Sequence, residues 1–377
     1  MKPLNIEICG KIEDSDVLSF PSVAKALGVS KQYISKFKNK GIIGFCKLHK
    51  LSHIITSSEQ DQIKTMSDWC LRMDTVELIK QSFEYAAITR NINLLNKLLE
   101  KHKKEKGSVG EYVRFYRLLY NYMIDEISGL DLIDYLDEIG QPADKALRIL
   151  MCIMKCYNYY FQKKFTLMLE VAQEAERLIE NLGDKRKGYI RDCYSLRLSE
   201  ILAPVYLRLN NLELARVYAG VIISSNICAK TVSDATYIIG MTYLKEDGKK
   251  ALDYLRESYE ISKKIGSEKL EVEAEYNLEM ARLYLKNDFS SREEGISYLK
   301  KIKEVFYQKE NEDFLVYFEA IYSDSISTMQ ESLQQFFAQS NYYFSSLLAK
   351  ELYNRGEKSF MIEWLIDFKK ERGEMLV

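Results

Sequence analysis

The 377-residue sequence contains only four prolines, Pro3, Pro21, Pro142 and Pro204. Because proline removes a backbone donor and breaks helices, a chain with so few prolines can stay helical almost throughout. No apolar run approaches the roughly 18 residues that a membrane span requires. The first residues, MKPLNIEICGKIEDSD, carry early acids and lack an apolar signal core. We therefore expect neither a membrane span nor a secretion signal.

Motifs typical of catalysis are absent as well. The sequence has no GxxxxGKS or GxxxxGKT phosphate loop, no GxGxxG after a predicted strand, no HExxH and no GxSxG. Its three histidines, His49, His53 and His102, belong to no nucleophile pattern, which leaves few candidates for a general base. Cys46, His49 and His53 could be imagined as metal ligands, but no fourth ligand follows at zinc-finger spacing. We therefore expect a binding protein without enzymatic activity, metal or cofactor.

The cysteines and the overall composition indicate the compartment and the class of protein. Seven cysteines, an odd number, are scattered along the chain, which favours a reducing cytoplasm over a disulfide framework. Apolar residues make up 47% of the chain and charged residues 29%, so we expect a globular protein rather than a disordered one. A chain of this length can bury a large core.

Residues 22–41, SVAKALGVSKQYISKFKNKG, have the spacing of a helix-turn-helix that reads DNA. Ala24 is a small residue where two helices would cross, Gly28 can adopt a positive φ in the turn, and Ile34 would hold the second helix down. Ser30 is the expected N-cap of that second helix. The segment predicts a DNA-binding domain over residues 1–56.

The exposed face of this second helix would present amide, hydroxyl and cationic groups, which base edges and phosphates accept. The residues on this face are Ser30, Lys31, Gln32, Tyr33, Ser35, Lys36 and Lys38. Six lysines and no acid lie between Lys31 and Lys50, although the net charge of the whole chain is -1. Positive charge is thus concentrated where double-stranded operator DNA would lie. The alternative is an ordinary helical hairpin with a solvated basic face.

Helical hairpins are expected from residue 67 onward, after a polar stretch at residues 57–66 that we interpret as a linker. Glycine and proline breaks predict hairpins over about 67–104, 110–138 and 144–182. Three later hairpins each contain a small residue, an aromatic residue and a second small residue, in that order. The first has Ala203, Tyr206 and Ala215, the second has Gly240, Tyr243 and Ala251, and the third has Ala281, Tyr284 and Gly295. This tetratricopeptide pattern predicts an all-α protein in which the head is followed by a right-handed α-solenoid over residues 67–377.

Stacked hairpins of this kind have a concave inner wall, and the repeat phase selects a set of residues on it within residues 145–320. They are Tyr157, Arg197, Glu200, Asp234, Tyr237, Met241, Glu275, Leu278 and Arg282. Acids would accept a basic side chain, arginine would bind a terminal carboxylate, and apolar pockets would lie between them, so the wall suits a short extended peptide. The alternative is that these side chains are solvated charges on helical faces.

The C-terminal part, residues 325–377, is rich in aromatic residues and ends in an amphipathic helix. A solenoid must cover its last apolar face, either with a cap of its own or with another subunit. Because DNA readers of this type bind two half-sites as dimers, we expect a homodimer formed through this end. The expected interface residues are Phe360, Ile362, Trp364, Leu365 and Phe368. An internal cap is the alternative.

Three segments resemble the arbitrium receptors, the AimR family of Bacillus phages. They are MSDWCLRMDTVELIKQSFEYA at residues 66–86, YIRDCYSLRLSEILAPVYLRLNNLELAR at 189–216 and LLAKELYNRGEKSFMIEWL at 347–365. The resemblance implies a dimeric transcription factor that binds its operator when peptide-free and activates a gene holding the phage in the lytic programme. A short communication peptide, imported by the host, would occupy the wall, end that activation and allow lysogeny.

Two other interpretations compete with this one. Related tetratricopeptide proteins are peptide-regulated and act on a response regulator, but they lack a helix-turn-helix head. A plain scaffold would bind a protein partner through its solenoid alone. Deleting residues 1–56 separates these interpretations, because a scaffold would keep its partner and a transcription factor would lose its DNA target.

Overall fold

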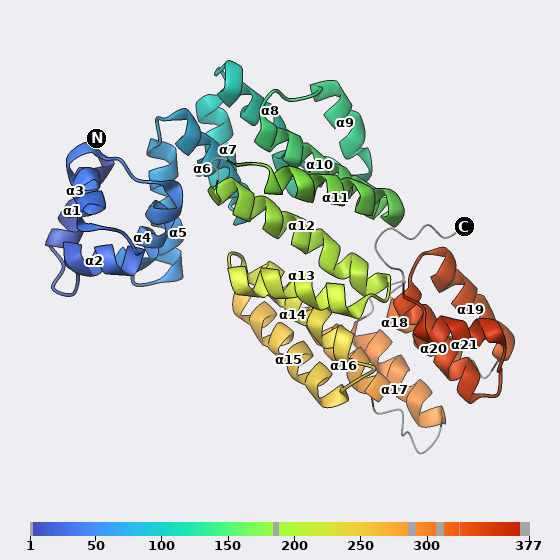
Figure 1. Cartoon of the computed structure of the whole chain (residues 1–377). Helices are drawn as coiled ribbons and strands as arrows, with labels where there is room; N and C mark the ends of the chain where they lie inside the picture. Colours follow the sequence, from blue (N-terminus) through green and yellow to red (C-terminus); the bar gives the residue numbers. More distant parts are fainter. Residues whose placement is uncertain (1–2, 184–187, 286–291, 307–312, 324, 370–377) are drawn as a thin grey trace. The chain divides into compact units, whose positions relative to one another are not determined.

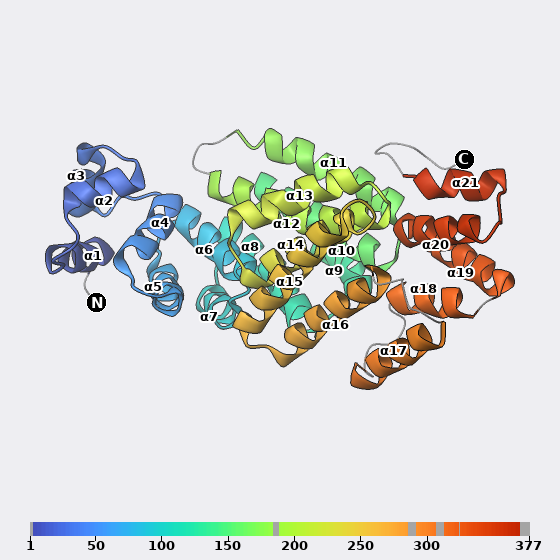
Figure 2. The same ribbon diagram turned by 90° about the horizontal axis from the view of Figure 1, so that it is seen from below.

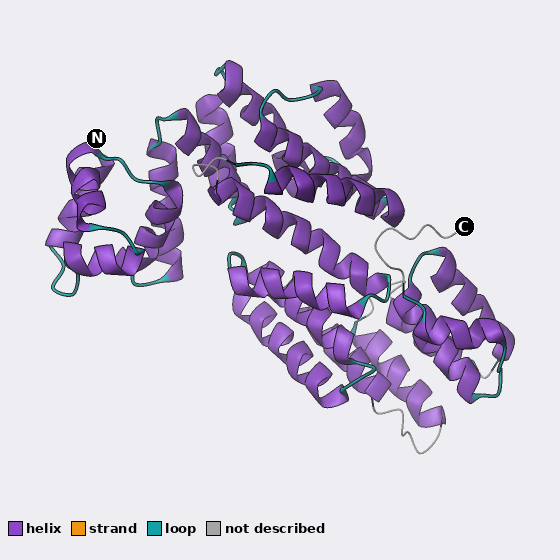
Figure 3. Cartoon of the chain, viewed as in Figure 1, coloured by secondary structure: helices purple, strands orange, loops and turns teal. Residues whose placement is uncertain are grey.

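The structure, a computed structural model, describes residues 3–183, 188–285, 292–306, 313–323 and 325–369 (Figure 1). Within these ranges every regular element is a helix and no strand occurs (Figure 3). The expected all-α fold class is therefore confirmed. No helix in the described ranges is both long and apolar enough to cross a membrane.

The chain divides into two compact units, residues 1–152 with 175–194, and residues 153–174 with 195–377. The first unit begins with a group of four helices, which we call the head and which is shown in dark blue in Figure 2. These helices are α1 (Leu4–Glu13), α2 (Phe20–Leu27), α3 (Lys31–Lys40) and α4 (Phe45–Ile55). The division between the units does not follow the expected boundary at residues 57–66, because further helices cluster with the head.

The further helices of the first unit are α5 (Glu59–Arg72), α6 (Val76–Ile88), α7 (Ile92–His102), α8 (Gly107–Met123) and α9 (Leu132–Ile139). The interpretation of residues 57–66 as a linker is wrong, since α5 already begins within them. Ser58 caps this helix by accepting a hydrogen bond from the Asp61 N–H at 3.1 Å, and Gln62 donates to Ser52 of α4 in a buried contact of 3.0 Å. The polarity of this stretch belongs to the exposed face of an amphipathic helix.

The hairpins expected from the sequence are mostly present. The range 67–104 holds the end of α5 together with all of α6 and α7, so it contains more than one hairpin. The pair α8 and α9 corresponds to the hairpin expected at 110–138. The next helices, parts of which belong to each unit, are α10 (Lys145–Phe161), α11 (Phe165–Glu180) and α12 (Gly188–Arg208).

The second unit continues as paired helices. They are α13 (Leu212–Ser225), α14 (Ala229–Tyr243), α15 (Gly248–Ile265), α16 (Glu268–Leu285), α17 (Arg292–Val305), α18 (Asp313–Tyr322), α19 (Ile326–Ala338), α20 (Tyr342–Asn354) and α21 (Phe360–Asp367). The repeat positions pack as the pattern predicts: Tyr206 is fully buried and stacks on Tyr218 with ring centroids 5.5 Å apart. A Cβ on Gly240 would lie 2.8 Å from Leu255 Cγ, so only glycine permits this close crossing of α14 and α15.

Candidate functional site

The turn between α2 and α3 has the geometry that the sequence predicts for a helix-turn-helix. Gly28 ends α2 in the left-handed conformation, with φ of 62°. Ser30 caps α3, and its side chain accepts a hydrogen bond from the Tyr33 N–H at 3.2 Å. Ala24 and Ile34 are each 5% exposed, so they hold the two helices together. Residues close together in the sequence therefore hold α3 in place, with its other face exposed.

Most residues expected to face DNA are on the surface of the head. Those that are exposed are Ser30, Lys31, Gln32, Ser35, Lys36 and Lys38. Tyr33 is half-buried, and its hydroxyl oxygen accepts a hydrogen bond from the Gly44 N–H at 2.9 Å, in the loop before α4. Tyr33 therefore also fixes the fold of the head, and replacing it would disturb more than a base contact.

Lys38 is already engaged by α1, a helix that the sequence reasoning did not single out. Its ammonium lies 2.6 Å from Oε1 of Glu13 and 4.7 Å from the centroid of the Phe20 ring. The hydrogen bond with Glu13 raises the pKa of Lys38. Asn5 of α1 also donates to the Lys38 carbonyl at 2.8 Å. A phosphate would therefore have to compete with Glu13 for this lysine.

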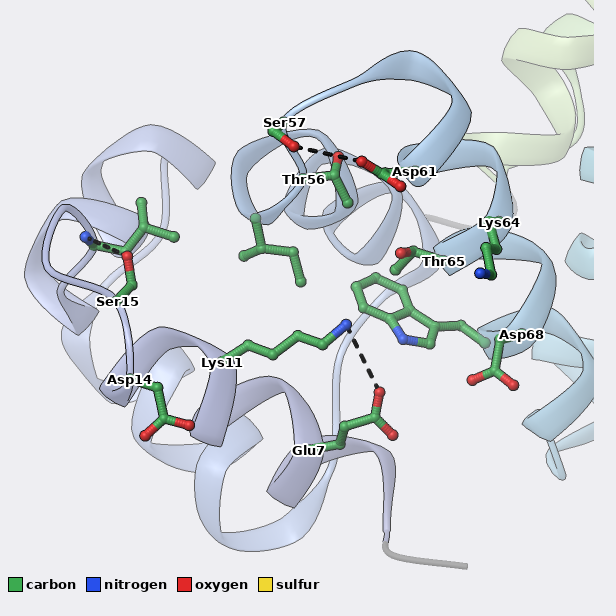
Figure 4. A pocket seen from close by; sticks show the side chains of 13 residues that line it. Glu7, Lys11, Asp14, Ser15, Thr56, Ser57, Asp61, Lys64, Thr65 and Asp68 are labelled. Atoms are coloured by element: carbon green, nitrogen blue, oxygen red, sulfur yellow. Dashed lines mark hydrogen bonds and ion pairs between the residues drawn. The ribbon is translucent and has the colours of Figure 1, made fainter.

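Helix α1 also faces α5, and a cleft of about 720 Å³ opens between them (Figure 4). Glu7 of α1 lies 2.6 Å from the guanidinium of Arg72 and 3.9 Å from the ammonium of Lys11. Trp69, which is 1% exposed, lines the same cleft from α5. The cleft arises from the packing of α1, so no local sequence signal could have indicated it.

The residues selected for the repeat wall divide by burial. Those at least partly exposed are Tyr157, Glu200, Asp234, Tyr237, Glu275 and Arg282. Asp234 pairs with Lys230 at 2.6 Å, one turn earlier on α14. Arg282 of α16 pairs with Glu279, which also accepts a hydrogen bond from the Tyr298 hydroxyl at 2.7 Å. These side chains offer charge of both signs at the surface of the second unit.

The other residues selected for the wall are buried. Met241 and Leu278 are 1% and 3% exposed, so their expected position on an open wall is wrong. At Met241, the Tyr343 hydroxyl of α20 donates to the backbone carbonyl at 2.7 Å, so this end of α14 is covered by another helix. On α16 the residue next to Leu278, Glu279, is partly exposed. Arg197 is also buried, at 4% exposure.

The last helix, α21, divides the expected interface residues into two faces. Ile362 and Leu365 are 5% and 3% exposed because they pack within the same chain, so their assignment to a subunit interface is wrong. Phe360 is 84% exposed and Trp364 is 43% exposed. Phe368 is half-buried, with its ring 4.8 Å from that of Tyr342. The helix thus caps α20 with one face and leaves an aromatic face open.

Helix α4 carries two neighbouring histidines, and burial changes the pKa of one of them. The rings of His49 and His53 lie 4.9 Å apart, and His49 also contacts Tyr85 at 5.4 Å. Burial, with a smaller repulsion from His53, lowers the pKa of His49 to about 4. No group of three or more His, Cys, Asp or Glu side chains able to hold a metal occurs in the part of the chain that the structure describes.

The head, with its capped turn between α2 and α3, precedes a series of paired helices. The family model for AimR transcriptional regulator-like proteins matches residues 62–290, and the chain belongs to this family. The helical-repeat architecture and the membership in this class of regulator, both expected from the sequence, are therefore confirmed.

Two solved structures share the fold of this chain. A structure of selenomethionine phAimR is 19% identical, covers 96% of this chain and 99% of its own, and has a TM-score of 0.71. A structure of phAimR with a ligand is 19% identical, covers 84% of this chain and 99% of its own, and has a TM-score of 0.61. At this identity the likeness shows a shared fold. No curated protein matches the sequence.

Proposed function

We propose that the protein is a DNA-binding transcription regulator of the bacterial cytoplasm that is controlled by a short peptide. The observation that carries this proposal is the head, where Gly28 and Ser30 fix a helix-turn-helix and α3 presents a polar, basic face. Membership in the AimR transcriptional regulator-like family supports a role in transcription, although the family match itself begins at residue 62.

In this proposal some exposed residues of α3 contact base edges and others contact phosphates. The amide of Gln32 reads base edges in the major groove, because an amide can both donate and accept. Lys31 at the start of the helix and Lys36 in its middle are both exposed, and they bind phosphates and set the register. Lys38 also binds a phosphate once its ion pair with Glu13 is broken.

The peptide binds to the exposed side chains of the second unit. Asp234 and Glu275 accept a basic side chain, Arg282 binds a terminal carboxylate, and Tyr157 and Tyr237 provide apolar surface. The ligand-bound phAimR structure, whose fold this chain shares, supports a ligand-binding role for the fold. Each of these residues is at least partly exposed, as a peptide contact requires.

Control follows from linkage between the two binding events. A peptide lowers DNA affinity only to the extent that it prefers a conformation or dimer spacing that fits the operator poorly. The exposed aromatic face of α21, with Phe360 and Trp364, forms the homodimer. By the family resemblance, the free dimer activates a gene that maintains the lytic programme of a phage, and the peptide allows lysogeny.

An operator titration of single variants tests the head. Lys36→Ala should weaken binding to all sequences and flatten the slope of log affinity against log salt by about 0.9, because one phosphate contact is lost. Gln32→Ala should instead change the sequence preference. Lys249→Ala, which removes an exposed lysine from α15, is the matched control and should do neither. If Lys36→Ala and Gln32→Ala both bound like the wild type and like Lys249→Ala, the head would not be the DNA-binding site.

A further inference from the structure

The end of α14 is joined to the C-terminal helices by contacts that are distant in sequence. The Tyr343 hydroxyl of α20 donates to the Met241 carbonyl at 2.7 Å, in a buried contact between residues 102 positions apart. Lys245, four residues further along, follows the end of α14 and also contacts α20. Both contacts lie within the second unit.

The ammonium of Lys245 has three neighbours. It donates to Oδ1 of Asn210 at 2.8 Å and to Oγ of Ser346 at 2.5 Å, and it lies 4.8 Å from the centroid of the Tyr343 ring. An ammonium group has three hydrogens, and two of them have hydrogen-bond acceptors here. The geometry therefore fixes the position of Lys245 relative to both α20 and Asn210.

Keeping a cation at this place is unfavourable for folding. Burial lowers the pKa of Lys245 to about 8, and Lys350 of α20 acts in the same direction. Asp367 of α21 and Glu246 oppose this effect and raise the pKa. A buried charge of this kind is often neutral or destabilising when compared with an apolar side chain of similar size. Its contribution must then be sought in positioning rather than in stability.

Asn210 continues the connection to the last helix. It lies in the turn between α12 and α13, with φ of 60°, a left-handed conformation that asparagine tolerates. Its side-chain nitrogen donates to the Phe368 carbonyl at 2.7 Å, while its oxygen accepts from Lys245. The Phe368 ring lies 4.3 Å from that of Trp364, on the exposed face of α21.

From these contacts we infer that Lys245 and Asn210 are positioning residues that set the end of α21 according to the position of α14. The inference rests on the proposed function, in which a peptide contacts α14 and α21 forms the dimer. Asp234 and Tyr237 belong to α14 itself, so a peptide that rotates or shifts this helix moves Lys245 with it. Hydrogen bonds of 2.5–2.8 Å weaken steeply with displacement and angle, so the exposed face of α21 responds to small movements.

Two conservative variants separate this role from a general role in folding. Lys245→Met keeps the length of the side chain and removes both hydrogen bonds and the charge. The gain from removing the buried charge and the loss of two hydrogen bonds oppose each other, so the thermal midpoint should change little. Asn210→Asp keeps the acceptor for Lys245 and the tolerance for positive φ, but removes the donor to Phe368. Lys249→Met, at an exposed lysine of the neighbouring helix, is the matched control.

The chain contains only two tryptophans, Trp69 and Trp364, which allows a direct readout. Full-length protein labelled with 5-fluorotryptophan gives two ¹⁹F signals, which Trp364→Phe assigns. Lys245→Met and Asn210→Asp should each move the Trp364 signal and leave the Trp69 signal in place. In sedimentation experiments without peptide, both should weaken dimerisation roughly fivefold, because each variant loses at least one hydrogen bond of this connection.

The inference would be overturned if the Trp364 signal in both variants matched that of Lys249→Met. It would also be overturned if the Trp364 signal moved only together with a lower thermal midpoint, since that result indicates a structural role alone. A wild-type chain that stayed monomeric at all concentrations would refute the dimer in the proposed function. The Trp364 signal would then still decide whether Lys245 and Asn210 position α21.

Discussion

Two glycines of the head differ in their backbone conformation, so we expect opposite responses to the same substitution. Gly28 has φ of 62° in the turn between α2 and α3, whereas Gly10 lies inside α1 without a positive φ. A Cβ added at either position would meet nothing within 4 Å. Alanine therefore tests the backbone alone at both positions, without a contribution from packing.

The magnitudes follow from the cost of each conformation. A non-glycine residue in the left-handed region costs about 1–2 kcal/mol, and the lower entropy of the unfolded alanine chain offsets part of this. Gly28→Ala should therefore destabilise the head by about 1 kcal/mol. In a helix interior alanine is better than glycine by about 0.5–1 kcal/mol, so Gly10→Ala should stabilise the head by that amount. The two variants should differ by about 2 kcal/mol.

Hydrogen exchange of the amides of α2 and α3 measures this local stability in the full chain. Exchange should be roughly fivefold faster in Gly28→Ala than in the wild type and slower in Gly10→Ala, since 1 kcal/mol changes the open population about that much. DNA affinity should fall with Gly28→Ala only. Faster exchange in both variants, or no change in either, would show that the turn conformation does not limit the stability of the head.

Three further predictions concern pH, the repeat crossing and the head electrostatics. The pKa of His49 is lowered to about 4 in the folded chain, so as the pH falls His49 is protonated in the unfolded chain before it is protonated in the folded one. The free energy of unfolding should therefore fall by about 2 kcal/mol between pH 7 and pH 5. Urea unfolding should show this loss in the wild type and not in His49→Gln. Gly240→Ala should destabilise the second unit by about 1–2 kcal/mol in urea unfolding, because its Cβ would meet Leu255, whereas Gly220→Ala, which meets nothing, should not. Glu13→Gln should free Lys38 and steepen the salt dependence of DNA binding by about 0.9, unlike the control Asp16→Asn.

Much of the fold and of the head could be predicted because the signals are local. The turn depends on Gly28 and on the cap at Ser30, both within a few residues of the helices they join. The repeat pattern likewise placed Tyr206 and Gly240 correctly, since a repeated spacing reveals which face of each helix is buried. The stretch at residues 57–66 was misjudged because the polar face of an amphipathic helix resembles a linker when its buried partners are unknown.

The parts that could not be predicted depend on segments far apart in the chain. Met241 fits the phase of an open wall, yet Tyr343, 102 residues later, covers it. The pairing of Glu13 with Lys38 joins exposed side chains 25 positions apart and leaves no periodic pattern. Ile362 and Leu365 have the apolar character that either a cap or a subunit interface requires, and only their packing in the same chain distinguishes the two.

The central claim is that the head binds DNA and that a peptide releases it. The most direct test is anisotropy binding of the full chain to DNA flanking its own gene, with and without synthetic peptides encoded immediately downstream. We predict tight, salt-sensitive binding to one fragment that a single peptide abolishes. Weak binding to all fragments that no peptide alters would contradict it.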